Sequence, residues 1–241
     1  GTDKISSRLQ FRLNNTLQAS ESIEVVGNRI SMSTDYQDFK NQNYWNVLLQ
    51  RTAGPSGSDT YTSHSYQLYV GESKGDKLKI LQAVSMSFGG NNYSQSAANW
   101  IGTGSRNASH DGNLIVGETM TGSVAEVKTW KYPLSASIFK QHIYDKKSAV
   151  GNSLEDSKTS LIYHYRLNEN YNPGFISKTS LLFTAASSQY VDLGTNSLFS
   201  SAEASFTFWI KPTTIGEHNI FAKDEYSQDI AVRLTSSDKI R

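Results

Sequence analysis

Cysteine is absent from the 241-residue sequence. This absence excludes disulfide scaffolds, thiolate metal sites and cysteine nucleophiles. It does not fix the compartment, because extracellular assemblies can be stable without disulfides. An excess of one charge is lacking too, since 23 Lys and Arg residues face 22 Asp and Glu residues. A nearly neutral chain gains little from non-specific attraction to nucleic acid or anionic lipid, so we expect neither as a partner.

Long apolar runs are missing as well. No segment approaches the roughly 18 to 20 apolar residues that span a bilayer. The first ten residues, GTDKISSRLQ, lack the basic and then apolar order of a signal peptide. We therefore expect a soluble chain that does not insert into a membrane.

Period-two alternation of apolar and polar residues runs through most of the sequence. In residues 8–15, Leu9, Phe11 and Leu13 alternate with polar residues, as in a strand with one buried face. Residues 65–84 predict a hairpin with its turn near residues 73–76. Further strands are predicted at residues 44–52, 113–118 and 122–132. In the last of these, alternation groups Val124, Glu126 and Lys128 against Ala125, Val127 and Thr129.

One short helix is predicted near residues 134–146. Ser135 can cap its start, and its apolar face combines Ile138, Phe139, His142 and Ile143. Everything else favours sheet, so we predict an all-β protein, an antiparallel β-sandwich with one short helix. Two long polar stretches, residues 51–65 and 87–113, are predicted loops, and residues 148–160 have the composition of a linker.

Two groups of residues carry a family resemblance. LLFTAASSQYVDLG followed by ASFTFWIKP, within residues 181–212, resembles the first strands of laminin-G-like, concanavalin A-like jelly-roll sandwiches. The end of the same pattern lies earlier in the chain, as YWNVLLQR, then GSVAEVKTW, then PLSASIFKQHI. The resemblance implies a laminin-G/concanavalin A-like fold.

The order of these motifs leaves two domain organisations open. Residues 1–150 resemble a sandwich that lacks its first strands, residues 151–179 a linker with one strand, and residues 180–241 the opening strands of a second sandwich. Alternatively, residues 180–241 supply the missing strands of one permuted domain. TDKI at residue 2 and SDKI at residue 237 match at three of four positions, as tandem repeats in a longer multi-domain protein would.

Catalytic apparatus is not visible in the sequence. Glycoside hydrolases use two carboxylates across the sugar bond, but Glu21 and Glu24 fall on opposite faces of a strand. The five histidines show no metal-ligand spacing. No Gly-x-Ser-x-Gly elbow occurs either. We therefore expect no enzymatic activity and no catalytic residues.

Binding is the expected role, and the loop of residues 87–113 holds its candidates. Laminin-G-like sandwiches often bind calcium and a glycan or protein at the rim, so the resemblance allows calcium as a cofactor, with unknown ligands. Amide and carboxylate groups could contact a ligand, and Tyr and Trp could stack on a sugar ring. The candidate residues are Asn91, Asn92, Tyr93, Trp100 and Asp111. The alternative is that these residues only satisfy turn geometry and packing.

LIYHYRLNENY, residues 161–171, also resembles segments of tailed-bacteriophage fibre or decoration proteins with laminin-G-like domains. The expected function is a non-enzymatic structural or adhesion module on a virion or extracellular surface. Its expected partners are other subunits of an oligomeric assembly, and a host glycan is a second candidate. The alternative is a calcium-dependent carbohydrate-binding lectin domain.

Overall fold

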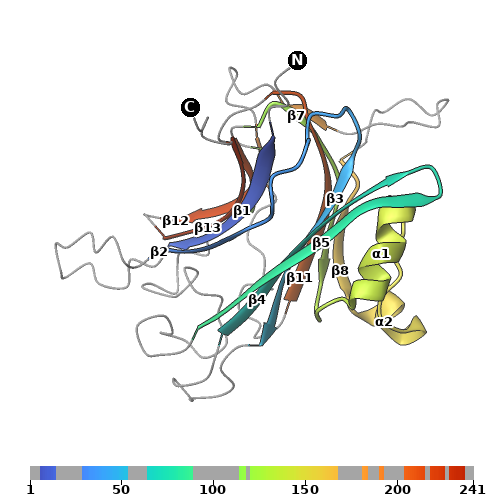
Figure 1. The fold of residues 1–241 in the computed structure, drawn as a ribbon. Helices are drawn as coiled ribbons and strands as arrows, with labels where there is room; N and C mark the ends of the chain where they lie inside the picture. Colours follow the sequence, from blue (N-terminus) through green and yellow to red (C-terminus); the bar gives the residue numbers. More distant parts are fainter. Residues whose placement is uncertain are drawn as a thin grey trace, which may run out of the picture.

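The computed structural model describes residues 6–14, 29–53, 64–88, 114–117, 120–167, 181–183, 190–192, 204–214, 218–225 and 228–236. Statements about the structure concern these residues. Their strands form two antiparallel sheets, as the sequence predicts for a β-sandwich (Figure 1).

The first sheet, called sheet A, has six described strands. Their order is β10 (Val191–Asp192), β6 (Leu114–Val116), β12 (His218–Glu225), β13 (Gln228–Ser236), β1 (Ser7–Asn14) and β2 (Arg29–Ser33). β1 pairs with both β13 and β2, so it lies inside the sheet.

The second sheet, sheet B, has seven described strands. Six follow the order β5 (Lys77–Phe88), β4 (His64–Lys74), β3 (Trp45–Ala53), β11 (Ala204–Pro212), β7 (Gly122–Trp130) and β8 (Leu161–Tyr165). The seventh, β9 (Leu181–Phe183), pairs with the start of β7, while β8 pairs with its end. The predicted hairpin of residues 65–84 is confirmed as β4 and β5.

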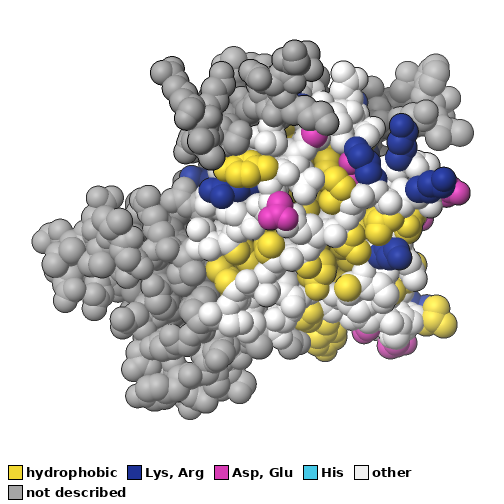
Figure 2. All heavy atoms as spheres, viewed as in Figure 1, with side chains coloured by type: hydrophobic (Ala, Val, Ile, Leu, Met, Phe, Trp, Pro, Cys, Tyr) yellow, Lys and Arg dark blue, Asp and Glu magenta, His cyan; other side chains and the backbone are white. Residues whose placement is uncertain are grey.

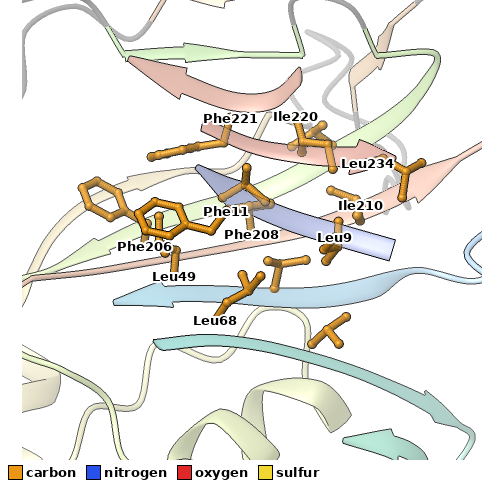
Figure 3. Packing of buried hydrophobic residues seen from close by; sticks show 14 of the residues in the cluster. Leu9, Phe11, Leu49, Leu68, Phe206, Phe208, Ile210, Ile220, Phe221 and Leu234 are labelled. Carbon is orange, nitrogen blue, oxygen red and sulfur yellow. The ribbon is translucent and has the colours of Figure 1, made fainter. Parts of the chain in front are cut away.

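The main hydrophobic core lies between the inner faces of the two sheets (Figure 3). Leu9 and Phe11 of β1 are fully buried in it, which confirms the inner face that their alternation predicts. Figure 3 shows Phe206 and Phe208 of β11 and Phe221 of β12 in the same cluster. The Phe208 and Phe221 rings stack with their centroids 5.6 Å apart. Aromatic side chains thus fill much of the space between the sheets.

Strands from the C-terminal part of the chain pair with N-terminal strands in both sheets. β11 lies between β3 and β7, and β13 lies between β12 and β1. The described strands of residues 181–236 therefore belong to the same two sheets as those of residues 7–165.

The predicted helix is confirmed as α1 (Ala136–Tyr144). Ser135 caps it, because its Oγ accepts a hydrogen bond from the Ile138 N–H at 3.3 Å. The predicted apolar face is the buried one. It packs on the outer face of sheet B against Leu48 and Trp130, and this second hydrophobic cluster covers part of that sheet (Figure 1).

A second helix, α2 (Leu154–Thr159), was not predicted. It lies in the stretch whose composition resembles a linker, and it is capped by Ser153, whose side chain accepts from the Asp156 N–H. α2 packs against β8. Among the described helices, none has the length and apolar character needed to cross a membrane.

Candidate functional site

β7 carries one more residue than its partner β11 within one stretch of their pairing in sheet B. Thr207 pairs with Lys128, and Trp209 pairs with Ala125. Two steps along β11 therefore face three steps along β7, which defines a β-bulge. Glu126 lies within the bulge and has a φ of 54°. A positive φ is uncommon for a residue other than glycine and marks a backbone held by its surroundings.

The bulge changes which side chains of β7 face the core. The Glu126 N–H donates to the Arg166 carbonyl at 3.1 Å instead of continuing the regular ladder. Val124 and Val127 both belong to the main core. The predicted alternation, which put Val127 on the face opposite Val124, is therefore wrong beyond the bulge. Bulges re-aim side chains in this way, because the extra residue shifts the period by one.

Charged side chains gather around this bulge. We call Glu126, Lys128, Lys146 and His164 the β7 charged cluster. Glu126 Oε2 lies 2.5 Å from His164 Nε2 and 3.9 Å from Lys128 Nζ. Glu126 is 3% exposed. Burial alone would raise the pKa of its carboxyl group, but the hydrogen bond from His164 and the nearby Lys128 charge outweigh burial and lower it. The carboxylate is therefore ionised in the folded chain.

Lys128 is the most buried cation of the cluster, at 1% exposure. Its Nζ donates to the Lys146 carbonyl oxygen at 3.0 Å. Burial lowers the pKa of Lys128 to about 8, and the Glu126 charge opposes this shift. The ammonium is held by one carbonyl and one carboxylate, which satisfies a charge that would otherwise be costly to bury.

Aromatic and basic side chains continue the arrangement beyond the cluster. Lys146 Nζ lies 3.7 Å from the centre of the Tyr44 ring, and Lys211 Nζ lies 5.9 Å from the same ring. Burial lowers the pKa of Lys146, while the Glu126 carboxylate raises it. Both ammonium groups lie close enough for cation–π attraction.

A buried histidine lies next to this region. His142 of α1 is 1% exposed, and its Nε2 lies 2.8 Å from the Val150 carbonyl oxygen. Burial lowers the pKa of His142 to about 4. The imidazole is therefore neutral near pH 7 and donates its Nε2 proton to Val150. Its ring centre lies 5.8 Å from that of Trp130.

The chemistry of these groups is that of paired buried charges. The cluster combines one carboxylate with one imidazole and two ammonium groups. Its contacts join β7 to β8 through His164, and β7 to the segment after α1 through Lys146. Glu126 therefore ties β8 to β7, and Lys128 ties the segment after α1 to the same strand.

A second buried carboxylate lies at the turn end of β4. Glu72 is fully buried, and its Oε1 accepts from Asn41 Nδ2 at 2.8 Å and from Asn43 Nδ2 at 2.5 Å. Its Oε2 lies 3.0 Å from Lys79 Nζ. Oε1 therefore holds the segment before β3 against β4, and Oε2 links β4 to Lys79 of β5.

The predicted ligand residues lie outside the described part of the chain. These residues are Asn91, Asn92, Tyr93, Trp100 and Asp111. Within the described ranges, no group of three or more His, Cys, Asp or Glu side chains is placed to hold a metal ion.

The sequence did not predict the β7 charged cluster. The alternation in residues 122–132 groups Glu126 and Lys128 with Val124 on one strand face and predicts no charge pairing there. Two charged residues inside GSVAEVKTW, flanked by valine and tryptophan, were the available signal. Buried charges require partners, and His164 comes from a strand 38 positions away from Glu126, a distance that periodicity does not bridge.

Comparison of the chain with protein-family models, with curated proteins and with solved structures found no match.

Proposed function

We propose that this chain is a non-enzymatic structural or adhesion module of a virion or extracellular surface. The β-sandwich supplies a rigid scaffold, and the module acts through the surfaces that it presents to other subunits. The laminin-G-like resemblance of the sequence supports the same class of role.

One observation carries the proposal: large apolar side chains are exposed in the segment that contains the two helices and the start of β8. Of the eight large apolar side chains exposed in the described residues, five fall between residues 132 and 162. They are Tyr132, Tyr144, Val150, Leu154 and Ile162. We call them the helical-side residues. These residues are close in sequence, and a contiguous exposed apolar patch formed by them would favour an interaction surface.

Leu154 is the clearest of these residues. It is the first residue of α2 and is 86% exposed, while Glu155 and Lys158 of the same helix are charged. An apolar side chain with a charged rim is the usual composition of a protein–protein contact. Burying such a side chain contributes about 2 kcal/mol, which a partner surface would supply.

The first experiment is a glycan array with the labelled chain, run with calcium and again with EDTA, together with a turnover assay on polysaccharides. Our proposal expects neither calcium-dependent binding nor turnover. Binding that EDTA abolishes, and that Trp100→Ala removes without unfolding the chain, would instead establish the lectin alternative. Turnover of any polysaccharide would refute the non-enzymatic role.

The second experiment tests the helical-side residues directly. A photo-crosslinking amino acid replaces Leu154, and the chain is assembled with the particle or matrix that contains it. We expect one defined crosslinked partner. Lys140, an exposed polar residue of α1, is the matched control position and should give little product. Equal crosslinking at both positions would contradict a specific contact.

A further inference from the structure

β5 is the end strand of sheet B in the order of the described strands. It is 12 residues long, and in the described part of the chain it pairs with β4 alone. Figure 1 shows β5 as the long strand at the edge of its sheet, running from the β4–β5 turn across the molecule. The outward backbone groups of a strand in this position form a template for another strand.

Beyond a β-bulge at Lys79, near the turn, β5 lacks the features that usually protect an edge. Natural edge strands carry central charges, prolines or bulges that prevent pairing. Here the nine residues from Ile80 to Phe88, ILQAVSMSF, contain no charge, proline or glycine. The charges of β5 are Lys77 and Lys79, both at the end next to the turn. Among the described strands, this uncharged part of β5 pairs with β4 alone, and the Asp35 N–H donates to the Gln82 side chain.

Apolar side chains remain partly uncovered along the same strand. Ile80, Val84 and Met86 pack against the main core but are only partly buried. Leu81 on the other face is 39% exposed. Figure 2 shows apolar side chains across the side of the molecule over which β5 passes, with Lys and Arg side chains near the end that carries the turn. A neighbouring strand would cover this apolar surface.

We propose that β5 pairs with β5 of a second copy of this chain, antiparallel and about a two-fold axis. The pairing would join two copies of sheet B into one continuous sheet. This inference rests on the proposed assembly role and names one partner in it.

The charge distribution favours a second copy in this orientation. An antiparallel pair puts the two lysine ends at opposite ends of the interface, whereas a parallel pair would align them. In a register centred on Ala83, Lys79 faces Ser87 of the other copy, and Leu81 faces Ser85. No like charges are then opposed, and like charges directly opposite would destabilise the pair. The strand is thus complementary to itself, as a two-fold interface requires.

The test is the mass of the chain in solution, measured by light scattering after size exclusion over about a hundredfold range of concentration. We expect a concentration-dependent dimer. Ala83→Lys, at the exposed centre of β5, should raise the dimer dissociation constant by at least about tenfold, because two lysines then face each other across the axis. Ser137→Lys on the exposed face of α1 is the matched control and should leave the dimer unchanged.

A charge exchange keeps the proposal falsifiable if one variant folds poorly. Ala83→Asp should also give monomers, and a mixture of Ala83→Lys and Ala83→Asp chains should form a one-to-one dimer. A wild-type chain that stays monomeric, or a dimer that Ala83→Lys leaves intact, would overturn the proposal. The crosslinking experiment at Leu154 tests the assembly role separately. A chain that stays monomeric but still crosslinks to a partner at Leu154 would refute the β5 pairing and leave the assembly role standing.

Discussion

Lowering the pH from about 7.5 to about 5 should destabilise the fold through His142. The imidazole is 1% exposed, and burial lowers its pKa to about 4 from an ordinary value of 6.5. Between these two values the unfolded chain binds a proton that the folded chain excludes. The free energy of unfolding therefore falls as the pH falls through this window.

The magnitude follows from the difference between the two pKa values. The two pKa values are 6.5 in the unfolded chain and about 4 in the folded chain. At about 1.4 kcal/mol for each pH unit, their difference lowers the free energy of unfolding by about 3 kcal/mol below pH 4. At about pH 5, some 2 kcal/mol of this is already lost. The carboxyl group of Glu126 affects stability in a different pH range. Its pKa is lowered from 4.5, so its stabilisation is lost only at more acidic pH. The difference between the wild type and a His142 variant in the window from pH 6.5 to 5 therefore reports on His142.

The assay is urea unfolding followed by tryptophan fluorescence, repeated at several pH values. Trp130 packs close to His142, so it reports on this part of the fold. His142→Gln cannot take up a proton, so its unfolding free energy should change about 2 kcal/mol less than that of the wild type between about pH 7.5 and 5. Lys140→Gln, on the exposed face of α1, is the control and should keep the wild-type slope. An unchanged slope in His142→Gln would refute the reasoning.

Other substitutions test single contacts, each by urea unfolding at neutral pH. Gly71→Ala should cost about 2 kcal/mol, because the new Cβ would lie 2.1 Å from Ile143 Cδ1; adding Ile143→Val should recover part of it, and strict additivity would argue against this contact. Ser135→Ala should cost about 1 kcal/mol through the lost helix cap; a neutral result would show that the 3.3 Å hydrogen bond from the Ile138 N–H to Ser135 Oγ does not stabilise α1. Glu126→Gln should cost about 3 kcal/mol, because the buried Lys128 loses its counter-ion; a cost near zero would show that the pair contributes nothing.

Local periodicity predicted much of this fold. β1 and α1 have their predicted inner faces because alternation and helical spacing act over a few residues. The β4–β5 hairpin was predictable for the same reason, since its turn follows directly from the residues between two strands. Short elements were not predicted, because they contain too few residues to show a period. One example is α2, which has six residues and the composition of a linker.

Long-range register could not be predicted. The bulge at Glu126 arises where β7 meets β11, a strand some 80 residues away, and nothing within β7 itself requires an extra residue there. Once the bulge forms, it decides that Val127 faces the core and that Glu126 meets His164. The charged cluster is thus a property of strand pairing, whereas the proposed ligand residues of the loop remain predictions outside the described residues.

The two proposed surfaces belong to different parts of sheet B. The helical-side residues lie between residues 132 and 162, whereas β5 is the end strand of the described sheet, on the side away from β8 (Figure 1). Pairing two edges extends a sheet sideways, so it leaves the layer above the sheet where it was. Leu154 therefore stays available to another subunit when two copies join through β5. A module with two independent contacts of this kind can link more than one neighbour, which an assembly requires and a single binding face does not provide.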